Sequence, residues 1–374
     1  MKISHVSARR LAIDSAPWYG GATPPGEQKS FQFPLLEITT DEGLTGYSTG
    51  YCPLGQGRGA TQQLVDVYSR VLLGRDPLAI EGIWQDLRRQ GRHLYTMSDA
   101  SMGQVDVALW DIKGKALGVS IATLLGKTRD TVGAYGTGSY FLDTPDDVAR
   151  EARSIRDRGY SGAKFNMFQG PQIDIPKLEA ARDAVGPDFS LMLDGSSHLS
   201  YADALVIGRS IGDLGFDWFE EPLCDRQLAK LRELRAALDV PILGAETVSL
   251  MELGDAMATS TFDLVRGDVY IKAGITGLMK AIGMADILGV PLEIHACASP
   301  LLDIANLHVA CATATTDRLE VHHEMFRFGV IDNPMEIDAQ GRLHCPDGPG
   351  LGVELDWDWI DDHTVETVTP DPLA

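Results

Sequence analysis

Three stretches of the chain decide its fold: residues 190–195 read SLMLDG, residues 217–222 read DWFEEP, and residues 241–246 read PILGAE. Each is a short apolar run that ends at an acidic residue. Each is followed by about a dozen residues with the apolar spacing of an amphipathic helix. This alternation is typical of parallel strands joined by helical crossovers.

The same alternation extends in both directions along the chain. After Lys127 the apolar runs are, in order, VGAYGTG, GAKFNMF, the three runs above, LVRGDVY, PLEIHAC and RLEVHH. Eight such strand and helix units form a barrel. The sequence therefore predicts an α/β fold with a barrel over residues 128–330.

The segments on either side of the barrel have a different pattern of apolar and polar residues. Residues 31–50 read as strand, turn and strand, which is the pattern of an antiparallel hairpin. Helical spacing follows over residues 79–90 and 98–118. A chain of 374 residues has room for a barrel and a smaller partner. We therefore expect an α+β domain over residues 1–127, with the segment 331–374 packing back on it.

The composition excludes some classes of partner. A net charge of −21 argues against binding to nucleic acid or to an anionic membrane, because both require a basic surface. An anionic substrate would need a local cation in its pocket. The five cysteines form no CxxC pair, which favours reduced thiols over disulfides or a zinc site. With no apolar signal segment near the start, we expect a cytoplasmic protein that does not enter membranes.

Polar residues end five successive barrel strands. They are Asp194, Glu220, Glu246, Asp268 and His295, and the intervals between them are 22 to 27 residues, each about one strand and helix unit. Equivalent positions on successive strands face one another across one rim of a barrel. In barrels of this type the carboxyl-terminal rim is the catalytic one.

Three carboxylates on one rim need a cation, since they would otherwise repel one another and resist ionisation. Oxygen ligands with open positions favour Mg²⁺, so Asp194, Glu220 and Glu246 are the predicted metal ligands. The alternative is that these residues only cap the helices that follow. Lys164, near the end of an earlier strand, is expected to add a positive charge beside the metal. The alternative is a lysine whose side chain extends from the strand end into solvent.

His295 lies in an apolar run, where a lone histidine is more often a core residue than a base. Asp268 alters that balance, because a carboxylate one strand away can orient the imidazole and stabilise its protonated form. The two residues are therefore a candidate catalytic base and its partner.

At this point the chain resembles a known family. The spacing of the residues above, with ALWDIKGKALGVSIATLLGK at 108–127, WFEEP at 218–222 and GIT at 274–276, is similar to that of the enolase superfamily, mandelate racemase subgroup. The resemblance implies a modified TIM barrel, (β/α)7β, under an N-terminal α+β capping domain, with one Mg²⁺ per subunit stabilising an enediolate. It implies that Asp194, Glu220 and Glu246 bind the metal and that Asp268 and His295 form the base pair. Glu320 matches the group that hydrogen-bonds the developing enediolate.

One departure from the family bears on the reaction type. The family's racemases carry a K-x-K pair whose second lysine is a base on the face opposite the histidine, whereas this chain has Lys164, Phe165 and Asn166. Asparagine cannot take a proton, so two-base racemisation or epimerisation should be lost. Dehydratases that resemble galactonate dehydratase also show K-x-N at this place. Lys164 would remain as a charge partner for the substrate carboxylate.

Further residues are candidates for substrate binding. The dehydratases can place a second acid two residues after the first metal ligand, and this chain has Ser196 there with His198 two residues later, so His198 is either that acid or a structural loop residue. His322 and His323 are similar cases beside Glu320. Adjacent strand residues face opposite ways, so only one of the two should face the barrel interior, and His322 is the candidate. Asn166 is a further candidate for substrate binding. Trp18 and Tyr51 lie in loops that contain Gly and Pro, and these loops are either mobile segments that cover a substrate or ordinary surface turns.

The leading hypothesis is a Mg²⁺-dependent dehydratase of a sugar acid, an aldonate or aldarate, that yields a 2-keto-3-deoxy acid. The alternative is an isomerase of the same superfamily, either a cycloisomerase of a sugar-acid lactone or a racemase or epimerase. A third hypothesis is a barrel that binds metal and acid without turnover. The predicted partner is a small carboxylate substrate, and homo-oligomers are expected by analogy.

Overall fold

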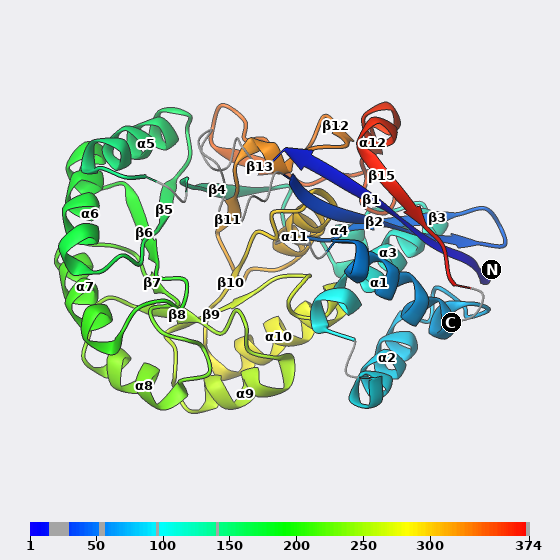
Figure 1. The fold of residues 1–374 in the computed structure, drawn as a ribbon, viewed down its shortest axis with the longest axis horizontal. Coiled ribbons are helices and arrows are strands. Elements are labelled where there is room, and N and C mark those ends of the chain that lie inside the picture. Colours follow the sequence, from blue (N-terminus) through cyan, green and yellow to red (C-terminus); the bar gives the residue numbers. More distant parts are fainter. Residues whose placement is uncertain (15–29, 52–56, 95–96, 140–141, 372–374) are drawn as a thin grey trace.

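The computed structural model describes residues 1–14, 30–51, 57–94, 97–139 and 142–371. Figure 1 shows two parts side by side. Parallel strands with helices around them form one part, and a blue and red antiparallel sheet with the first helices forms the other. Within these described ranges, no helix is both long enough and apolar enough to span a membrane.

Strands and helices alternate after residue 130. The strands are β4 (Thr131–Thr137), β5 (Gly162–Asn166), β6 (Ser190–Asp194), β7 (Phe219–Glu220), β8 (Ile242–Gly244), β9 (Leu264–Gly267), β10 (Leu292–Ile294) and β11 (Arg318–Val321). The helices between them are α5 (Pro145–Asp157), α6 (Pro171–Val185), α7 (Tyr201–Asp213), α8 (Leu228–Ala236), α9 (Leu250–Ala258), α10 (Gly274–Leu288) and α11 (Pro300–Ala312). This order confirms the predicted (β/α)7β barrel.

The barrel strands are parallel and are hydrogen-bonded in chain order from β4 to β10, and β11 pairs in parallel with β4. β10 lies beside β11, where the Thr315 hydroxyl donates to the Leu292 carbonyl oxygen at 2.8 Å. All five residues of β5 are buried. Burial on both faces explains why the barrel strands read as continuous apolar runs rather than alternating ones.

Side chains fill the barrel interior below the rim that carries the predicted site residues. Tyr135, Met192, Trp218 and Leu243 form one buried cluster. The strand register pairs Met192 with Lys164, and it pairs Asp194 with both Asn166 and Glu220. The polar strand ends of β5, β6 and β7 therefore lie at one level above a packed core.

The N-terminal part is an antiparallel sheet packed on helices. Its strands are β1 (Ile3–Asp14), β2 (Ser30–Thr40), β3 (Thr45–Thr49) and, from the end of the chain, β15 (Thr364–Val368), in the order β15-β1-β2-β3. The helices are α1 (Gly57–Leu72), α2 (Ile80–Leu94), α3 (Asp99–Leu117) and α4 (Ile121–Leu125). The predicted hairpin over residues 31–50 is confirmed as β2 and β3. β1 was not recognised from the sequence, although it alternates buried and exposed residues over part of its length.

The C-terminal segment contacts both parts of the molecule. It contains the 3-10 helix η2 (Glu324–Phe326), β12 (Val330–Ile331), β13 (Arg342–His344), β14 (Glu354–Leu355), α12 (Trp357–His363) and β15 (Thr364–Val368). β15 pairs with β1, whereas β13 pairs with the barrel strand β4. Arg342–His344 thus join the barrel sheet. The boundaries at residues 127 and 330 stay a prediction.

The two parts meet where α3 packs on the start of α10. The Asp106 carboxylate accepts a bond from the Thr276 backbone amide at 2.9 Å, and the Trp110 indole donates to the Thr276 hydroxyl at 3.0 Å. Gly274 has a φ of +93°, and a Cβ at that position would lie 2.3 Å from the Asp106 side chain. The GIT motif is therefore explained by a close contact between the two parts, which only glycine permits at its first position.

This contact predicts a pH-dependent stability. Burial raises the pKa of Asp106 from 3.8 to about 7, although the bonds from Thr276 oppose the change. The pKa of Asp106 is higher in the folded state than in the unfolded state. Its contribution to the free energy of unfolding is therefore fully present below pH 4 and falls by up to about 4 kcal/mol as the pH rises to 7. We expect the thermal midpoint of wild type to fall more from pH 5 to pH 8 than that of Asp106→Asn. Replacement of the exposed Asp286 by asparagine is the control, and equal pH profiles for wild type and Asp106→Asn would contradict the prediction.

Candidate active site

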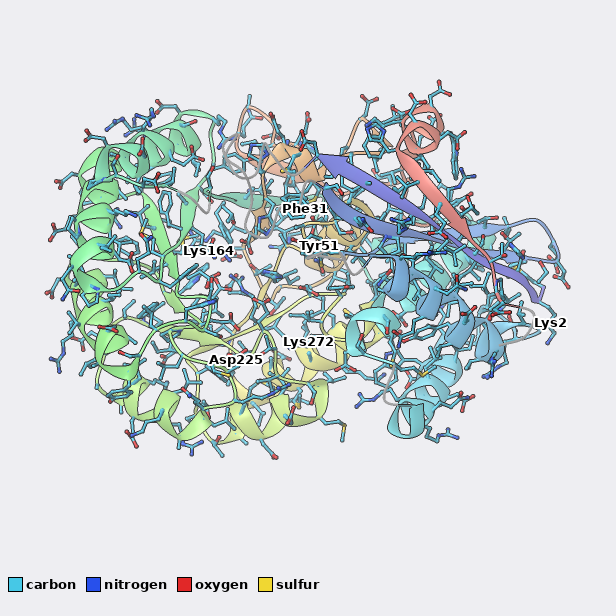
Figure 2. The ribbon with its side chains drawn as sticks, viewed as in Figure 1. Lys2, Phe31, Tyr51, Lys164, Asp225 and Lys272 are labelled. Carbon is cyan, nitrogen blue, oxygen red and sulfur yellow. The ribbon has the colours of Figure 1, made fainter. Side chains whose placement is uncertain are left out.

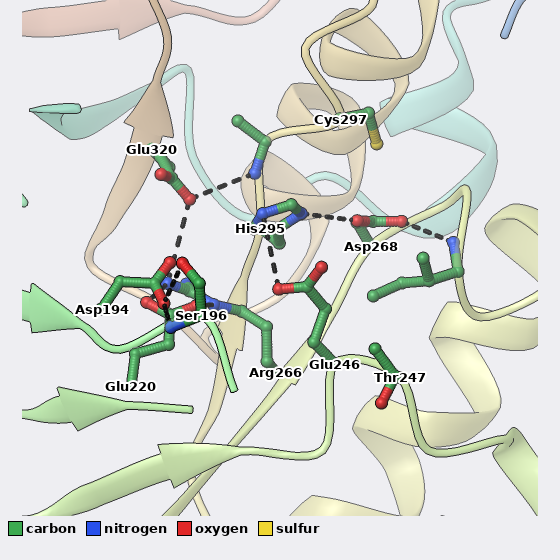
Figure 3. A network of polar contacts seen from close by, with 12 residues as sticks. Asp194, Ser196, Glu220, Glu246, Thr247, Arg266, Asp268, His295, Cys297 and Glu320 are labelled. Carbon is green, nitrogen blue, oxygen red and sulfur yellow. Dashed lines mark hydrogen bonds and ion pairs between the residues drawn. The ribbon is translucent and has the colours of Figure 1, made fainter. Parts of the chain in front are cut away.

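The predicted site residues lie on successive strands of the barrel rim, as Figure 3 shows for most of them. Lys164 and Asn166 are on β5, Asp194 ends β6, Glu220 ends β7 and Glu320 is on β11. Glu246, Asp268 and His295 follow the ends of β8, β9 and β10 within two residues. The structure therefore brings together, on one rim, residues that are spread over more than 150 positions of the sequence.

Lys164 is a buried cation shared by three carboxylates. Its Nζ lies 2.8 Å from Glu320 Oε1, 3.1 Å from Glu220 Oε2 and 3.6 Å from Asp194 Oδ2. Burial opposes its charge, but the negative charges of Glu220 and Glu320 outweigh burial and raise the pKa of Lys164 well above its usual value. Lys164 therefore stays an ammonium ion, which is the local cation that the acidic composition led us to expect.

Arg266 is a second buried cation, and the sequence analysis missed it. Its Nε donates to Glu220 Oε1 at 2.6 Å, and its Nη2 donates to Glu220 Oε2. Its Nη1 donates to the Tyr135 hydroxyl at 3.1 Å. Burial opposes the charge of Glu220, but Arg266 and Lys164 outweigh it and lower the pKa of Glu220 to about 2. Arg266 precedes Asp268 by two positions, so the two-residue period of a strand would have placed both on one face.

Asp194 is held by donors from two segments. Asn166 Nδ2 donates to Asp194 Oδ2 at 2.7 Å, and the Ser196 backbone amide donates to Asp194 Oδ1 at 2.7 Å. Burial, followed by the charge of Glu220, raises the pKa of Asp194 to about 6. The Asn166 amide thus serves as a hydrogen-bond donor to a neighbouring carboxylate and does not offer a basic atom.

His295 and Asp268 form the predicted pair. His295 Nδ1 lies 2.8 Å from Asp268 Oδ2, while Asp268 Oδ1 accepts from the backbone amides of Tyr270 and Ile271 at 2.6 and 2.7 Å. The other ring nitrogen, Nε2, lies 3.7 Å from Glu246 Oε2. Burial lowers the pKa of His295, but the charge of Glu246 and the bond to Asp268 outweigh it and raise the pKa to about 9.

Glu320, on β11, is fully buried. Its Oε1 accepts from Thr137 as well as from Lys164, and its Oε2 accepts from the Ala296 backbone amide at 3.4 Å. The Lys164 charge is the chief influence against burial, and the pKa of Glu320 lies well below its usual range. Glu320 is therefore ionised and neutralised by Lys164.

The two adjacent histidines that follow β11, His322 and His323, have different surroundings. The His322 ring lies 6.3 Å from the His295 ring, edge to face, and burial lowers its pKa to about 4. His323 instead accepts a bond from the Met325 backbone amide at 3.2 Å. His322 is thus neutral and next to the predicted base.

The remaining predicted contacts lie farther out. His198 is exposed, and its ring stacks on Phe168 at 4.6 Å. Tyr51 is half-buried, its backbone carbonyl accepts from the Tyr270 hydroxyl at 2.9 Å, and Figure 2 shows it where the antiparallel sheet meets the barrel. Trp18 lies outside the described residues.

Comparisons with known proteins agree with this geometry. Residues 147–359 match the family model for the enolase C-terminal domain-like fold, and residues 24–126 match that for the mandelate racemase / muconate lactonizing enzyme N-terminal domain. The chain belongs to this family. The predicted membership of the enolase superfamily, mandelate racemase subgroup, is confirmed, and the chain is an enzyme of that superfamily.

Relatives with this degree of similarity are named for different reactions. D-galactarolactone cycloisomerase from Agrobacterium fabrum is 33% identical, over 93% of this chain and 96% of the relative. Arabinonate dehydratase from Saccharolobus solfataricus is 33% identical, over 85% of this chain and 87% of the relative. The structure of D-glucarate dehydratase from Agrobacterium tumefaciens complexed with magnesium has a TM-score of 0.81 and 28% identity, over 98% of this chain and 100% of that one.

The donor set suits the magnesium that the family implies. All three predicted ligands are carboxylates, and burial with the charge of a neighbour raises the pKa of both Asp194 and Glu246. Glu221 Oε1 is buried nearby without a hydrogen-bond partner among the described residues. At Asp194 and Glu246, burial and neighbouring negative charges outweigh the positive charges close by, and a bound cation would offset them. In the described ranges, however, no three His, Cys, Asp or Glu side chains are gathered closely enough to hold a metal. Glu220 is instead bound by Arg266 and Lys164. The metal roles stay a prediction.

Proposed function

We propose that the chain is a Mg²⁺-dependent dehydratase of a sugar acid, an aldonate or aldarate. It would abstract the proton next to the carboxylate and eliminate water to give a 2-keto-3-deoxy acid. The observation that supports elimination most strongly is the single oriented base. His295 is held by Asp268 at 2.8 Å, whereas the position of the racemases' second lysine is Asn166, whose amide is bonded to Asp194. Dehydratases among the relatives support the same reaction class.

The proposed steps use residues of the barrel rim. His295 Nε2 takes the α-proton and, as imidazolium, returns a proton to the departing hydroxide, so that water leaves and the enol product tautomerises to the ketone. Lys164 is the charge partner of the substrate carboxylate. Glu320, whose pKa lies well below its usual range, donates a hydrogen bond to the developing enediolate only after it has taken up a proton. Asp194, Glu220 and Glu246 would hold the Mg²⁺, which would supply positive charge for the carboxylate oxygens of the substrate. A positive charge there would offset the charge of Glu246, which raises the pKa of His295, and would favour the basic form of the histidine.

Cycloisomerisation of a sugar-acid lactone is the second candidate. The relative that supports it, D-galactarolactone cycloisomerase, matches 93% of the chain. The same proton abstraction by His295 would serve both reactions, but cycloisomerisation loses no water.

The experiment that decides between them follows the mass and proton NMR spectrum of each substrate. The protein is incubated in D₂O with Mg²⁺ and a panel of hexonates, pentonates, aldarates and their lactones. Loss of water with a 2-keto-3-deoxy product supports the dehydratase and names its substrate. Rearrangement at constant mass supports the isomerase, and no turnover or exchange with any compound contradicts both.

The proposed metal site predicts pH-dependent binding of Mg²⁺. Asp194 has a pKa of about 6, so below that pH the ion must displace a proton from it, and above that pH it need not. We expect the affinity to fall by about tenfold for each pH unit below 6 and to level off above pH 7. Titration calorimetry at pH 5, 6 and 8 measures this, and equal affinity at pH 5 and pH 8 would show that Asp194 is not a ligand.

The remaining expectations stay proposals. These are one Mg²⁺ per subunit, a homo-oligomeric assembly and a cytoplasmic location. Sedimentation of the purified protein measures the assembly.

A further inference from the structure

The loop that carries Glu246 is held by two buried charges of opposite sign. This loop, residues 245–248, joins β8 to α9 and begins with Ala245 in the left-handed region at a φ of +70°. A non-glycine residue in that region costs about 1–2 kcal/mol. The surrounding contacts must offset this cost, because the loop would otherwise relax and carry Glu246 with it.

Lys272 binds the carbonyl side of the loop. Its side chain is fully buried, and its Nζ donates to the backbone oxygens of Ala245 at 2.7 Å, Glu246 at 2.9 Å and Val248 at 2.7 Å. An ammonium group has three donors, and all three are used on this one loop. Lys272 is in the segment between β9 and α10, so it ties the loop to the neighbouring unit of the barrel.

Asp225 binds the amide side of the same loop. It is fully buried, its Oδ1 accepts from the Ala245 backbone amide at 2.8 Å, and its Oδ2 accepts from the Thr247 amide at 2.8 Å and the Thr247 hydroxyl at 3.2 Å. Asp225 comes from the β7–α8 connection, on the other side of β8. Figure 2 shows the positions of Asp225 and Lys272 within the barrel.

We propose that Lys272 and Asp225 are positioning residues for the metal site: together they fix the 245–248 loop so that the Glu246 carboxylate faces His295 and is preorganised for Mg²⁺. This inference rests on the proposed function. Burying two charges in a core costs free energy, and here both charged side chains bind the backbone of the same four-residue loop. The bonds fix the backbone of Glu246 from both sides and leave its side chain free to bind.

The test is Mg²⁺ titration calorimetry on the metal-free protein without substrate, together with thermal unfolding. Lys272→Met removes the three donors, and Asp225→Asn replaces one accepting oxygen by a donor while keeping the shape. We expect each variant to bind Mg²⁺ about 10- to 100-fold more weakly than wild type, which is the usual effect of losing support behind a ligand. If Lys272→Met does not fold, Asp225→Asn still tests the proposal.

Asp263→Asn is the matched control, because it removes a similar bond at the other end of β8. Asp263 Oδ2 accepts from the Ile242 backbone amide at 2.9 Å, at the first residue of the strand. It should lower the thermal midpoint and leave the Mg²⁺ affinity within about twofold of wild type. Folded Lys272→Met or Asp225→Asn protein with the affinity of wild type would overturn the positioning role alone. A wild-type protein that bound no Mg²⁺ would overturn the metal site of the proposed function and the positioning role with it.

Discussion

Replacing His295 by asparagine is expected to lower turnover by about 10²- to 10⁴-fold, the contribution that a positioned general base makes. The asparagine amide can still donate to Asp268 Oδ2, where His295 Nδ1 now lies at 2.8 Å, but it has no atom that takes up a proton. Exchange of the substrate α-proton in D₂O should disappear together with turnover. The measurement is initial rate and deuterium incorporation on whichever acid the substrate panel identifies.

The control for this variant is His344→Asn. His344 also pairs with an aspartate, with its Nε2 2.7 Å from Asp338 Oδ2, but the pair is exposed and outside the barrel rim. His344→Asn should therefore keep full activity, and Mg²⁺ binding should survive in both variants because neither histidine is a predicted ligand. Full activity of His295→Asn would remove His295 from the mechanism.

Replacing Arg266 by methionine is expected to lower the free energy of unfolding by about 3–5 kcal/mol, the usual effect of removing one partner of a buried ion pair. Neither side chain of the pair is exposed to solvent, and Arg266 bonds both oxygens of Glu220. The variant would leave Glu220 buried with Lys164 as its remaining close cation. Urea unfolding followed by circular dichroism measures the loss.

Arg235→Met provides the comparison. Arg235 also pairs with a carboxylate, Asp263, but the two side chains are 36% and 30% exposed. Partly exposed pairs of this kind are worth up to about 1 kcal/mol, because solvent screens them. Losses of similar size in Arg266→Met and Arg235→Met would show that the buried pair contributes no more than an ordinary surface contact.

Much of the fold could be read from the sequence because parallel barrel strands are buried on both faces. That burial makes each strand a continuous apolar run, and the eight runs recur at a regular spacing after Lys127. The hairpin over residues 31–50 was equally legible. β1 was missed, and so was the pairing of β13 with β4, because antiparallel partners far apart in the sequence leave no local spacing to recognise.

The candidate site divides in the same way. Regular intervals and chemical type singled out Asp194, Glu220, Glu246, Asp268 and His295, since a barrel places every strand end on one rim. Arg266, Lys272 and Asp225 were not singled out, because the role of a buried charged residue follows from the groups that it contacts, and the sequence does not show these contacts. The partners of Arg266 and Lys272 come from other strands and loops, 20 or more positions away.

The sequence by itself thus determined the barrel, the rim on which the acidic residues meet, and the absence of a second lysine at Asn166. Only the tertiary structure decided how the charges are shared: Lys164 among three carboxylates, Arg266 on both oxygens of Glu220, and Asp225 with Lys272 on the loop of Glu246. The physical reason is that strand periodicity is a local property, whereas the ionisation and orientation of a buried group depend on every charge and dipole packed around it.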